Sequence, residues 1–236
     1  EGEKSFDEIK ISTRSLWKKY LSVVDVEDNN IINKQKFYTA LYHSLLIPWI
    51  ISDVDGNYRG ADGLIHKTRG NYEYGQFSPW DTYRSLHPML SLLYPEKQGD
   101  LLLSMIDFYH QSGHLPTESM TGNHAIDIIM DAYLKGFKGM DSMELYQAMK
   151  KQIMTGPFIQ KDMKAYLTNG YISSAYPESV TRTVEYAYDD WALAQFAKRV
   201  VHFKFDYDSL MFLSNAYKNL FYADSMFLVP RDGNEF

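Results

Sequence analysis

Tyr176-Pro-Glu-Ser-Val-Thr-Arg-Thr-Val-Glu-Tyr-Ala-Tyr-Asp-Asp-Trp-Ala-Leu-Ala-Gln-Phe-Ala-Lys-Arg-Val200 is the longest helical segment that the sequence predicts. Its apolar residues recur at helical spacing, and Pro177 stands where a helix begins. The same periodicity predicts eight more helices, at residues 5–22, 31–49, 78–93, 97–113, 121–138, 141–154, 157–169 and 206–222. Strand alternation is confined to short loop pieces. The sequence therefore predicts an all-α protein of about nine helices without a visible domain boundary.

Length and composition exclude several classes of protein. The 236 residues (27.5 kDa) carry 24 Lys and Arg against 30 Asp and Glu, a net charge of −6, which argues against nucleic-acid binding. No apolar run approaches the roughly 18–20 residues of a membrane span, and the first residues have no signal-peptide core. The absence of cysteine excludes a thiol nucleophile and a zinc-thiolate site. The chain also has 19 Tyr, 13 Phe and 4 Trp, which suit either a large helical core or a carbohydrate site.

The main irregularity is a long Gly/Asp-rich loop at residues 51–77, and loops of this length are often functional. Asp53, Asp55 and Asn57 match the first three ligand positions of an EF-hand calcium loop. Tyr58 stands where that loop needs glycine and Leu64 where it needs glutamate, so an EF-hand is excluded. Asp53 and Asp55 could still hold a ligand, or they could close the turn themselves.

Three further groups of polar residues could carry chemistry. Trp80, Asp81 and Arg84 open one helix, where a ring beside charged groups suits a sugar, although Asp81 also suits simple capping. Glu185 and Asp189 share a helix face with Arg182. They are either paired carboxylates of a glycosidase or members of an ion network within the helix. The third group lies between two helices: Glu118 is a loop carboxylate, and His124 is either a packed side chain or a ligand.

Six segments, taken in order, resemble glycoside hydrolase family 92, the calcium-dependent exo-acting α-mannosidases. They are Phe37-Tyr-Thr-Ala-Leu-Tyr-His43, Ser52-Asp-Val-Asp-Gly-Asn-Tyr-Arg-Gly60, Trp80-Asp-Thr-Tyr-Arg84 with His87-Pro88, Gly122-Asn-His124 with Asp131-Ala-Tyr-Leu-Lys-Gly136, Glu185-Tyr-Ala-Tyr-Asp-Asp-Trp191, and Asn215-Ala-Tyr-Lys-Asn-Leu-Phe221. The order of the six makes the resemblance specific, and it covers nearly the whole chain.

The resemblance implies an N-terminal β-sandwich followed by an (α/α)6 barrel, and hydrolysis with inversion by a general acid and a carboxylate base. It implies that Asp53 and Asp55 hold sugar hydroxyls, with Arg59 in the same segment. Trp80, Asp81 and Arg84 would line the same pocket, while Asp189 and Asp190 would have supporting roles. The family's segments for the acid, the base and the Ca²⁺ ligands are expected outside these residues, so no catalytic or metal residue is assigned here.

The length of the chain indicates how much of the barrel it can form. Nine helices in 236 residues leave about 26 residues per helix with its loop, so a twelve-helix barrel would need roughly 310 residues. We therefore expect residues 1–236 to be the central part of the catalytic domain, without the β-sandwich and the C-terminal part of the barrel, and inactive alone. The expected partners are the remainder of its own polypeptide and a mannose-containing glycan with α-1,2 linkages. The expected place is the periplasm, cell surface or medium.

Two other readings remain open at the level of sequence. One is a non-catalytic helical module that binds mannose or a glycan, which the Asp53/Asp55 loop and the aromatic residues permit. The other is a helical scaffold without a ligand.

Overall fold

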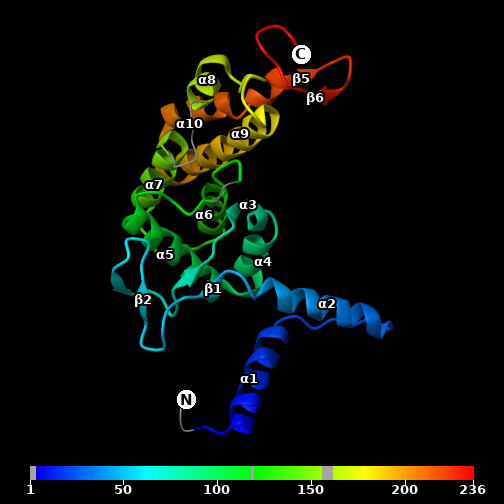
Figure 1. Ribbon diagram of the computed structural model, residues 1–236, viewed down its shortest axis with the longest axis vertical. Helices are drawn as coiled ribbons and strands as arrows, with labels where there is room; N and C mark the ends of the chain where they lie inside the picture. The colour runs from blue at the N-terminus through cyan, green and yellow to red at the C-terminus, as the bar shows by residue number, and fades with distance from the viewer. Residues whose placement is uncertain (1–3, 118–119, 156–161) are drawn as a thin grey trace. The chain divides into compact units, whose positions relative to one another are not determined.

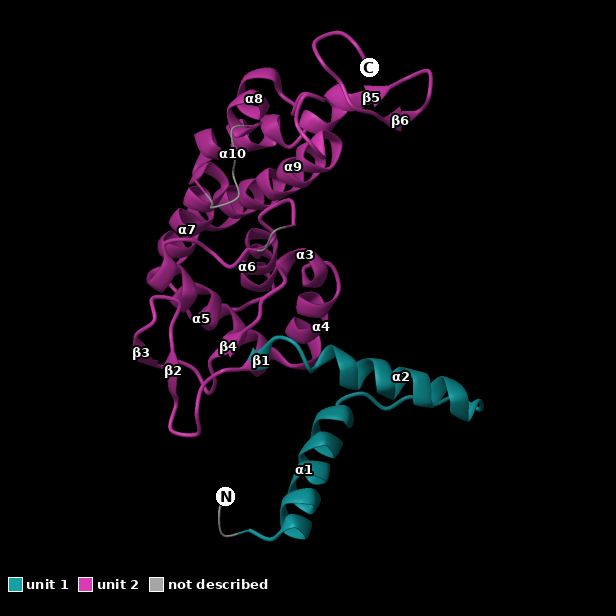
Figure 2. Cartoon of the chain, viewed as in Figure 1, with its two compact units in different colours: residues 1–49 teal, residues 50–236 magenta. Residues whose placement is uncertain are grey.

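A computed structural model describes residues 4–117, 120–155 and 162–236. Within these residues the chain forms ten α-helices and six strands of two or three residues, so the predicted all-α class is confirmed. The chain divides into two compact units, residues 1–49 and 50–236 (Figure 2). No helix of the described part is long and apolar enough to cross a membrane.

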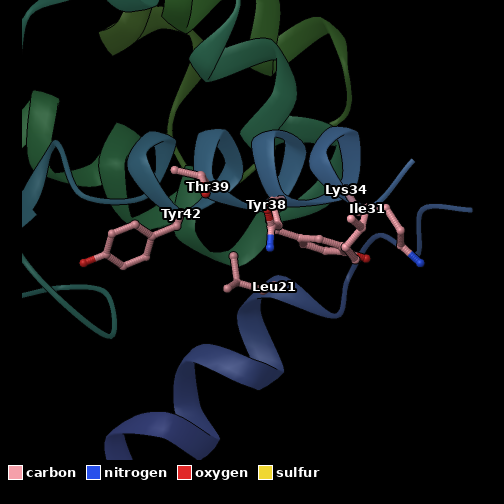
Figure 3. A pocket seen from close by; sticks show the side chains of 7 residues that line it. Leu21, Ile31, Lys34, Tyr38, Thr39 and Tyr42 are labelled. Atoms are coloured by element: carbon pink, nitrogen blue, oxygen red, sulfur yellow. The ribbon is translucent and has the colours of Figure 1, made fainter. Parts of the chain in front are cut away.

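Unit 1 consists of two helices. Helix α1 (Phe6–Leu21) begins with a capping box in which Ser5 and Glu8 satisfy each other's backbone N–H groups, and α2 (Ile31–Ser44) begins at an Asn30 cap. The sequence predicted a second helix as far as residue 49, but the helix ends five residues earlier. An open groove of about 500 Å³ runs along these helices (Figure 3) and is lined by Leu21, Ile31, Lys34, Gln35, Tyr38, Thr39 and Tyr42.

The Gly/Asp-rich loop is ordered by short strands: β1 (Trp49–Ile50), β2 (Asn57–Arg59), β3 (Ile65–Lys67) and β4 (Tyr74–Gly75). Strands β2 and β3 form an antiparallel hairpin in which Tyr58 lies opposite His66. The hairpin contacts α5 (Pro95–Ser112), because Gln111 donates a hydrogen bond to Tyr58 Oη (2.8 Å) and accepts one from the Ala61 N–H (2.9 Å).

The rest of unit 2 is helical (Figure 1). After α5 come α6 (Ala125–Leu134), α7 (Ser142–Thr155), α8 (Asp162–Asn169) and α9 (Ser179–Phe196), followed by a π-helical turn at Ala197–Val201. The chain then forms α10 (Lys204–Leu213), a 3₁₀ turn at Ala216–Leu220 and the hairpin of β5 (Phe221–Tyr222) and β6 (Phe227–Leu228). The predicted helix at 78–93 is two helices, α3 (Pro79–Thr82) and α4 (Leu86–Leu93), separated by three residues.

The core of unit 2 is built around α6. Ile126 and Ile129 of α6 pack with Leu193 and Phe196 of α9, and all four are at most 1% exposed. Helices α5 and α7 contribute Met105 and Met149 among others to the same cluster. Because α6 is covered by neighbouring helices, polar residues at its N-terminus are also removed from water, and this places the site described below.

The buried carboxyl group of Glu73 lies where the end of the Gly/Asp-rich loop meets α5. Glu73 is 3% exposed, and burial together with repulsion from Asp107 raises its pKa to about 8. Asp107 itself pairs with Arg69 at 2.7 Å. The folded protein therefore keeps a proton on Glu73 at neutral pH that the unfolded chain releases near pH 4.5.

This carboxyl group should make stability fall as the pH rises. The folded pKa lies above the unfolded one, so the contribution of Glu73 is complete below about pH 4.5 and is lost as the pH passes about 8. We expect Glu73→Gln to reduce the change in melting temperature between pH 5 and 9. Thermal unfolding of the native protein and the variant at fixed ionic strength measures this. The exposed Glu96→Gln is the matched control, and equal pH profiles for native protein and Glu73→Gln would contradict the assignment.

Candidate functional site

Helices α6 and α9 are in contact (Figure 1). A buried histidine surrounded by carboxylates lies between them. His124 is the N-cap residue of α6, and Asp127 follows it in the first turn. His124 Nδ1 lies 2.8 Å from Asp127 Oδ2 and 3.1 Å from Asp189 Oδ1, and its Nε2 lies 3.0 Å from Glu185 Oε2. The last contact has the length of a hydrogen bond but not its angle. We call these four residues the His124 cluster.

Backbone and amide groups hold this cluster in place. The Asn123 N–H donates a hydrogen bond to Asp189 Oδ2 at 2.6 Å. Gln152 of α7 donates to the Asn123 side chain at 3.1 Å and accepts from the Leu115 N–H at 3.0 Å. These bonds join the segment before α6, which contains Leu115 and Asn123, to α7 and α9. The position of Asp189 therefore depends on the packing of all three segments.

The charges in the cluster are interdependent. Burial alone would keep His124 neutral, but the three carboxylates around it outweigh burial and raise its pKa to about 12. Burial raises the pKa of Asp127 above its ordinary value, with repulsion from Asp189 added. The pKa of Glu185 is lowered: burial acts against this, but the contact with the His124 cation at 3.0 Å, followed by the charge of Arg84, prevails. His124 is therefore a buried cation that keeps Glu185 ionised.

A row of aromatic rings leads from this cluster to the surface. Tyr83 stacks on His124 with centroids 4.2 Å apart and planes 9° apart. Tyr188 lies 5.7 Å from Tyr83 and is itself stacked on Trp191, also at 5.7 Å. Tyr188 and Trp191 are 41% and 37% exposed, so two stacked rings face solvent beside a buried charge network.

Trp80 and Arg84 complete the exposed edge. The Arg84 guanidinium donates from Nε to Tyr83 Oη at 2.6 Å and lies over the Tyr83 ring. The Trp80 indole lies near enough to Glu185 to lower the carboxyl pKa, yet its buried N–H has no hydrogen bond of ordinary geometry among the described residues. A guanidinium and a carboxylate beside flat rings form a surface suited to polyhydroxylated ligands.

Of the six predicted binding residues, the structure brings Trp80 and Arg84 together with Glu185. Asp81 accepts a hydrogen bond from Ser78 Oγ at 2.5 Å, between two side chains at the start of α3. Asp53, Asp55 and Arg59 lie on and before the β2–β3 hairpin. Asp55 accepts hydrogen bonds from the Asn57 N–H (3.0 Å) and side chain (2.7 Å), an Asx turn, while Asp53 and Asp55 are exposed.

The other polar candidates have separate partners. Arg182 binds Asp162 of α8 at 2.8 Å, so Glu185 and Asp189 are joined to His124 across helices rather than to Arg182 within their own. Asp190 accepts a hydrogen bond from Tyr166 at 2.7 Å. Glu118 lies outside the described residues.

Sequence reasoning missed Asp127 and Tyr83. His124 and Asp127 are three residues apart at a helix start, and Glu185 and Asp189 are four apart on another helix. Each pair places its members on one helical face, and this signal alone could have suggested two facing polar pairs. Tyr83 has no such signal, because its stacking on His124 depends on the break between α3 and α4.

The cluster contains the one group of described residues whose ligand atoms could surround a metal ion: His124, Asp127 and Asp189, within 4.8 Å of one another. It does not fit Ca²⁺, which takes six to eight oxygen ligands. Here one of three ligands is an imidazole nitrogen, and the ring already acts as the cation between the carboxylates. The His124 cluster therefore does not fit the Ca²⁺ that the family resemblance implies.

Removal of calcium should leave this cluster intact. We expect the melting temperature of the 236-residue chain to change by less than about 1 °C between excess EDTA and millimolar CaCl₂, because the His124 cation already stands between the carboxylates. Melting curves in the two buffers measure this, with MgCl₂ as the control for ionic strength. A calcium-specific rise of several degrees would place a Ca²⁺ site within the chain.

A helical domain with exposed rings and a carboxylate at one helix junction is typical of helical carbohydrate-active domains. The chain matches the model of the glycosyl hydrolase family 92 catalytic domain over residues 1–236 and belongs to that family.

Solved structures of this family are similar to the chain. A family GH92 α-mannosidase from Bacteroides thetaiotaomicron, in complex with mannoimidazole, matches 99% of the chain at 33% identity and TM-score 0.90. An inverting mannosidase of the family, from strain VPI-5482 of that organism, matches 98% at 29% identity and TM-score 0.91. The predicted fold, helices of an (α/α)6 barrel, is confirmed by these relatives.

The chain spans about a third of each of these structures, 32% and 33%. An uncharacterized secreted glycosidase from Arthroderma benhamiae is 22% identical over 244 residues, which cover 93% of the chain and 27% of that protein.

Proposed function

We propose that this chain is part of an inverting, calcium-dependent α-mannosidase that removes mannose from glycans, with α-1,2-linked mannose as the preferred substrate. The observation that carries the proposal is the convergence of Trp80, Arg84 and Glu185 beside the exposed Tyr188 and Trp191 rings. Family membership and the mannosidase relatives support the same conclusion. The secreted relative favours export to the periplasm, cell surface or medium.

In this proposal the residues of the chain bind and orient the sugar. Trp80 contributes a ring edge, Arg84 contributes directed N–H donors, and Glu185 accepts hydroxyl groups. His124 keeps Glu185 charged, because a buried cation stabilises the neighbouring carboxylate. Asp53, Asp55 and Arg59 are proposed as further sugar contacts in the complete protein. The general acid, the base and the Ca²⁺ ligands are proposed to lie in other parts of the polypeptide.

Calcium, when bound, would polarise the sugar hydroxyl groups as a Lewis acid. The residues described here contribute to binding and to the exclusion of water and are not assigned to proton transfer. Accordingly, we expect the 236-residue chain alone to release no mannose, and calcium-dependent release by it would contradict this division of roles.

Trp80→Ala tests the pocket in the complete protein. We expect kcat/KM for an α-1,2-linked mannobiose to fall about tenfold or more, equivalent to ~1.4 kcal/mol of lost transition-state stabilisation. Trp49→Ala, which removes an exposed tryptophan of unit 1, is the matched control. Mannose release measured with and without calcium gives the rates. An unchanged kcat/KM in Trp80→Ala would show that the surface around Trp80 does not bind the substrate.

The alternative of a non-catalytic glycan-binding module is tested by the same protein. Calorimetric binding of mannose by the complete protein, without release of mannose from any linkage, would favour the module over the enzyme.

A further inference from the structure

A second pocket lies at the opposite end of α6 from the His124 cluster. It has a volume of about 360 Å³ and is formed by the end of α4, the start of α5 and the loop that follows α6. We call it the basal pocket; it is lined by Ser91, Pro95, Gln98, Ala132, Lys135, Gly136, Phe137, Lys138 and Gly139. Ten helical residues separate the two ends of α6, about 15 Å along its axis.

Two polar side chains of this pocket have buried atoms without a partner. Gln98 is 2% exposed; its Oε1 lies 2.9 Å from His87 Nδ1, while its Nε2 has no hydrogen bond among the described residues. Burial lowers the pKa of His87 to about 4, so the ring is neutral, and its Nδ1–H donates to Gln98. In this orientation of the amide, its NH₂ group is left over. Ser91 Oγ is also buried, and no described residue is its hydrogen-bond partner. Buried donors of this kind are costly unless a ligand or water satisfies them.

Two lysines and the start of a long helix line the pocket. Pro95 is the first residue of the 18-residue helix α5, whose N-cap position supplies no side-chain cap, so the positive end of the helix dipole borders the pocket. Lys135 and Lys138 line the other side. Lys135 is partly neutralised by Asp131 at 2.7 Å, and the exposed Glu96 stands in the first turn of α5, whereas Lys138 contacts only a carbonyl and the Tyr133 ring among the described groups.

From these features we propose that the basal pocket binds a small oxyanion, with Gln98 Nε2 and Ser91 Oγ as neutral donors and Lys138 as the charged one. The volume is larger than one tetrahedral anion requires, since a water molecule occupies about 30 Å³. Phe137 forms a flat apolar wall packed against Gly99, where a methyl group would lie 2.8 Å from the ring. The pocket therefore has room for a phosphate group that is attached to a compact organic body.

The test is a calorimetric titration of the complete protein at fixed ionic strength with inorganic phosphate, a hexose phosphate or the neutral hexose, with a hexose other than mannose so that the proposed mannose site does not contribute heat. We expect saturable binding of both phosphates and none of the hexose at this pocket. Tighter binding of the hexose phosphate identifies an organic phosphate, and equal binding identifies the free anion. Ser91→Ala and Gln98→Met should each weaken binding about tenfold or more, the loss of a hydrogen bond to a charged group.

Lys151→Met, elsewhere on the surface, is the control for net charge and should leave binding unchanged. Ser91→Ala keeps the test valid if Gln98→Met disturbs the fold around His87. The proposal is overturned if phosphate does not saturate, if the hexose binds as well as its phosphate, or if Ser91→Ala and a folded Gln98→Met bind phosphate as the native protein does. Since the readout is phosphate binding, it is independent of the proposed mannosidase activity.

Discussion

Replacing His124 with leucine should lower the free energy of unfolding by about 3–5 kcal/mol. Three carboxylates contact this ring, at 2.8, 3.0 and 3.1 Å, and its side chain is 1% exposed. Leucine has a similar size but no charge, so Asp127, Asp189 and Glu185 would stay together in a dry site without their cation. Folding would then require them to take up protons or to admit water, and both are unfavourable at neutral pH. Urea denaturation at pH 7 measures the change.

The same substitution at a surface histidine is the control. It shows how much of the lost stability comes from the burial of His124 among carboxylates and how much from replacing any histidine by leucine. His110 pairs with Glu144 at 2.5 Å but is 43% exposed, so His110→Leu should change the free energy of unfolding by less than about 1 kcal/mol. If His124→Leu costs no more than His110→Leu, the carboxylates do not depend on a cation, and the interpretation of the His124 cluster is wrong.

Most helices of unit 2 could be predicted from sequence because they bury one face, and a buried face leaves a periodic pattern. Their ends were less predictable. Residues 78–93 have a continuous apolar pattern, yet the chain breaks at residues 83–85, where Tyr83 turns to stack on His124. The last helix, predicted to reach residue 222, stops at Leu213 and gives way to a 3₁₀ turn and a hairpin. Tertiary contacts decide such boundaries, and the local pattern does not contain them.

The site was predictable only where its residues are close in sequence. Trp80 and Arg84 lie within five residues, and the grouping of a ring with a cation can be read directly. His124 and Glu185 are 61 residues apart and meet only because α6 and α9 pack together. The pattern of Arg182, Glu185 and Asp189 on one helix allowed an intrahelical network, but the packing of α8 gave Arg182 a closer partner in Asp162. The partner of a charged side chain is thus a property of the fold.

Replacing Glu185 with glutamine should reduce kcat/KM of the complete protein about 10- to 100-fold, if the proposed pocket binds sugar. A hydrogen bond to a charged group is worth about 1.5–3 kcal/mol, and glutamine keeps the size of glutamate while losing the charge. The variant retains an acceptor for His124 Nε2, and it leaves the stacked rings of Tyr83 and Tyr188 in place. We therefore expect the loss to appear in the kinetics of mannose release, with a small change in melting temperature.

The matched control lies two turns earlier on the chain. Glu178 is the N-cap residue of α9, has a 62% exposed side chain and approaches Arg182 only at 3.7 Å, so Glu178→Gln removes the same charge without touching the site. A purely structural role for Glu185 predicts the reverse of our expectation: the melting temperature of Glu185→Gln would fall, while kcat/KM per folded molecule would equal that of Glu178→Gln. A buried cation beside Glu185 serves folding in either case. Only a role in binding makes the rate depend on the charge of Glu185 in a variant that is still folded, and this is why the two quantities are measured on the same preparation.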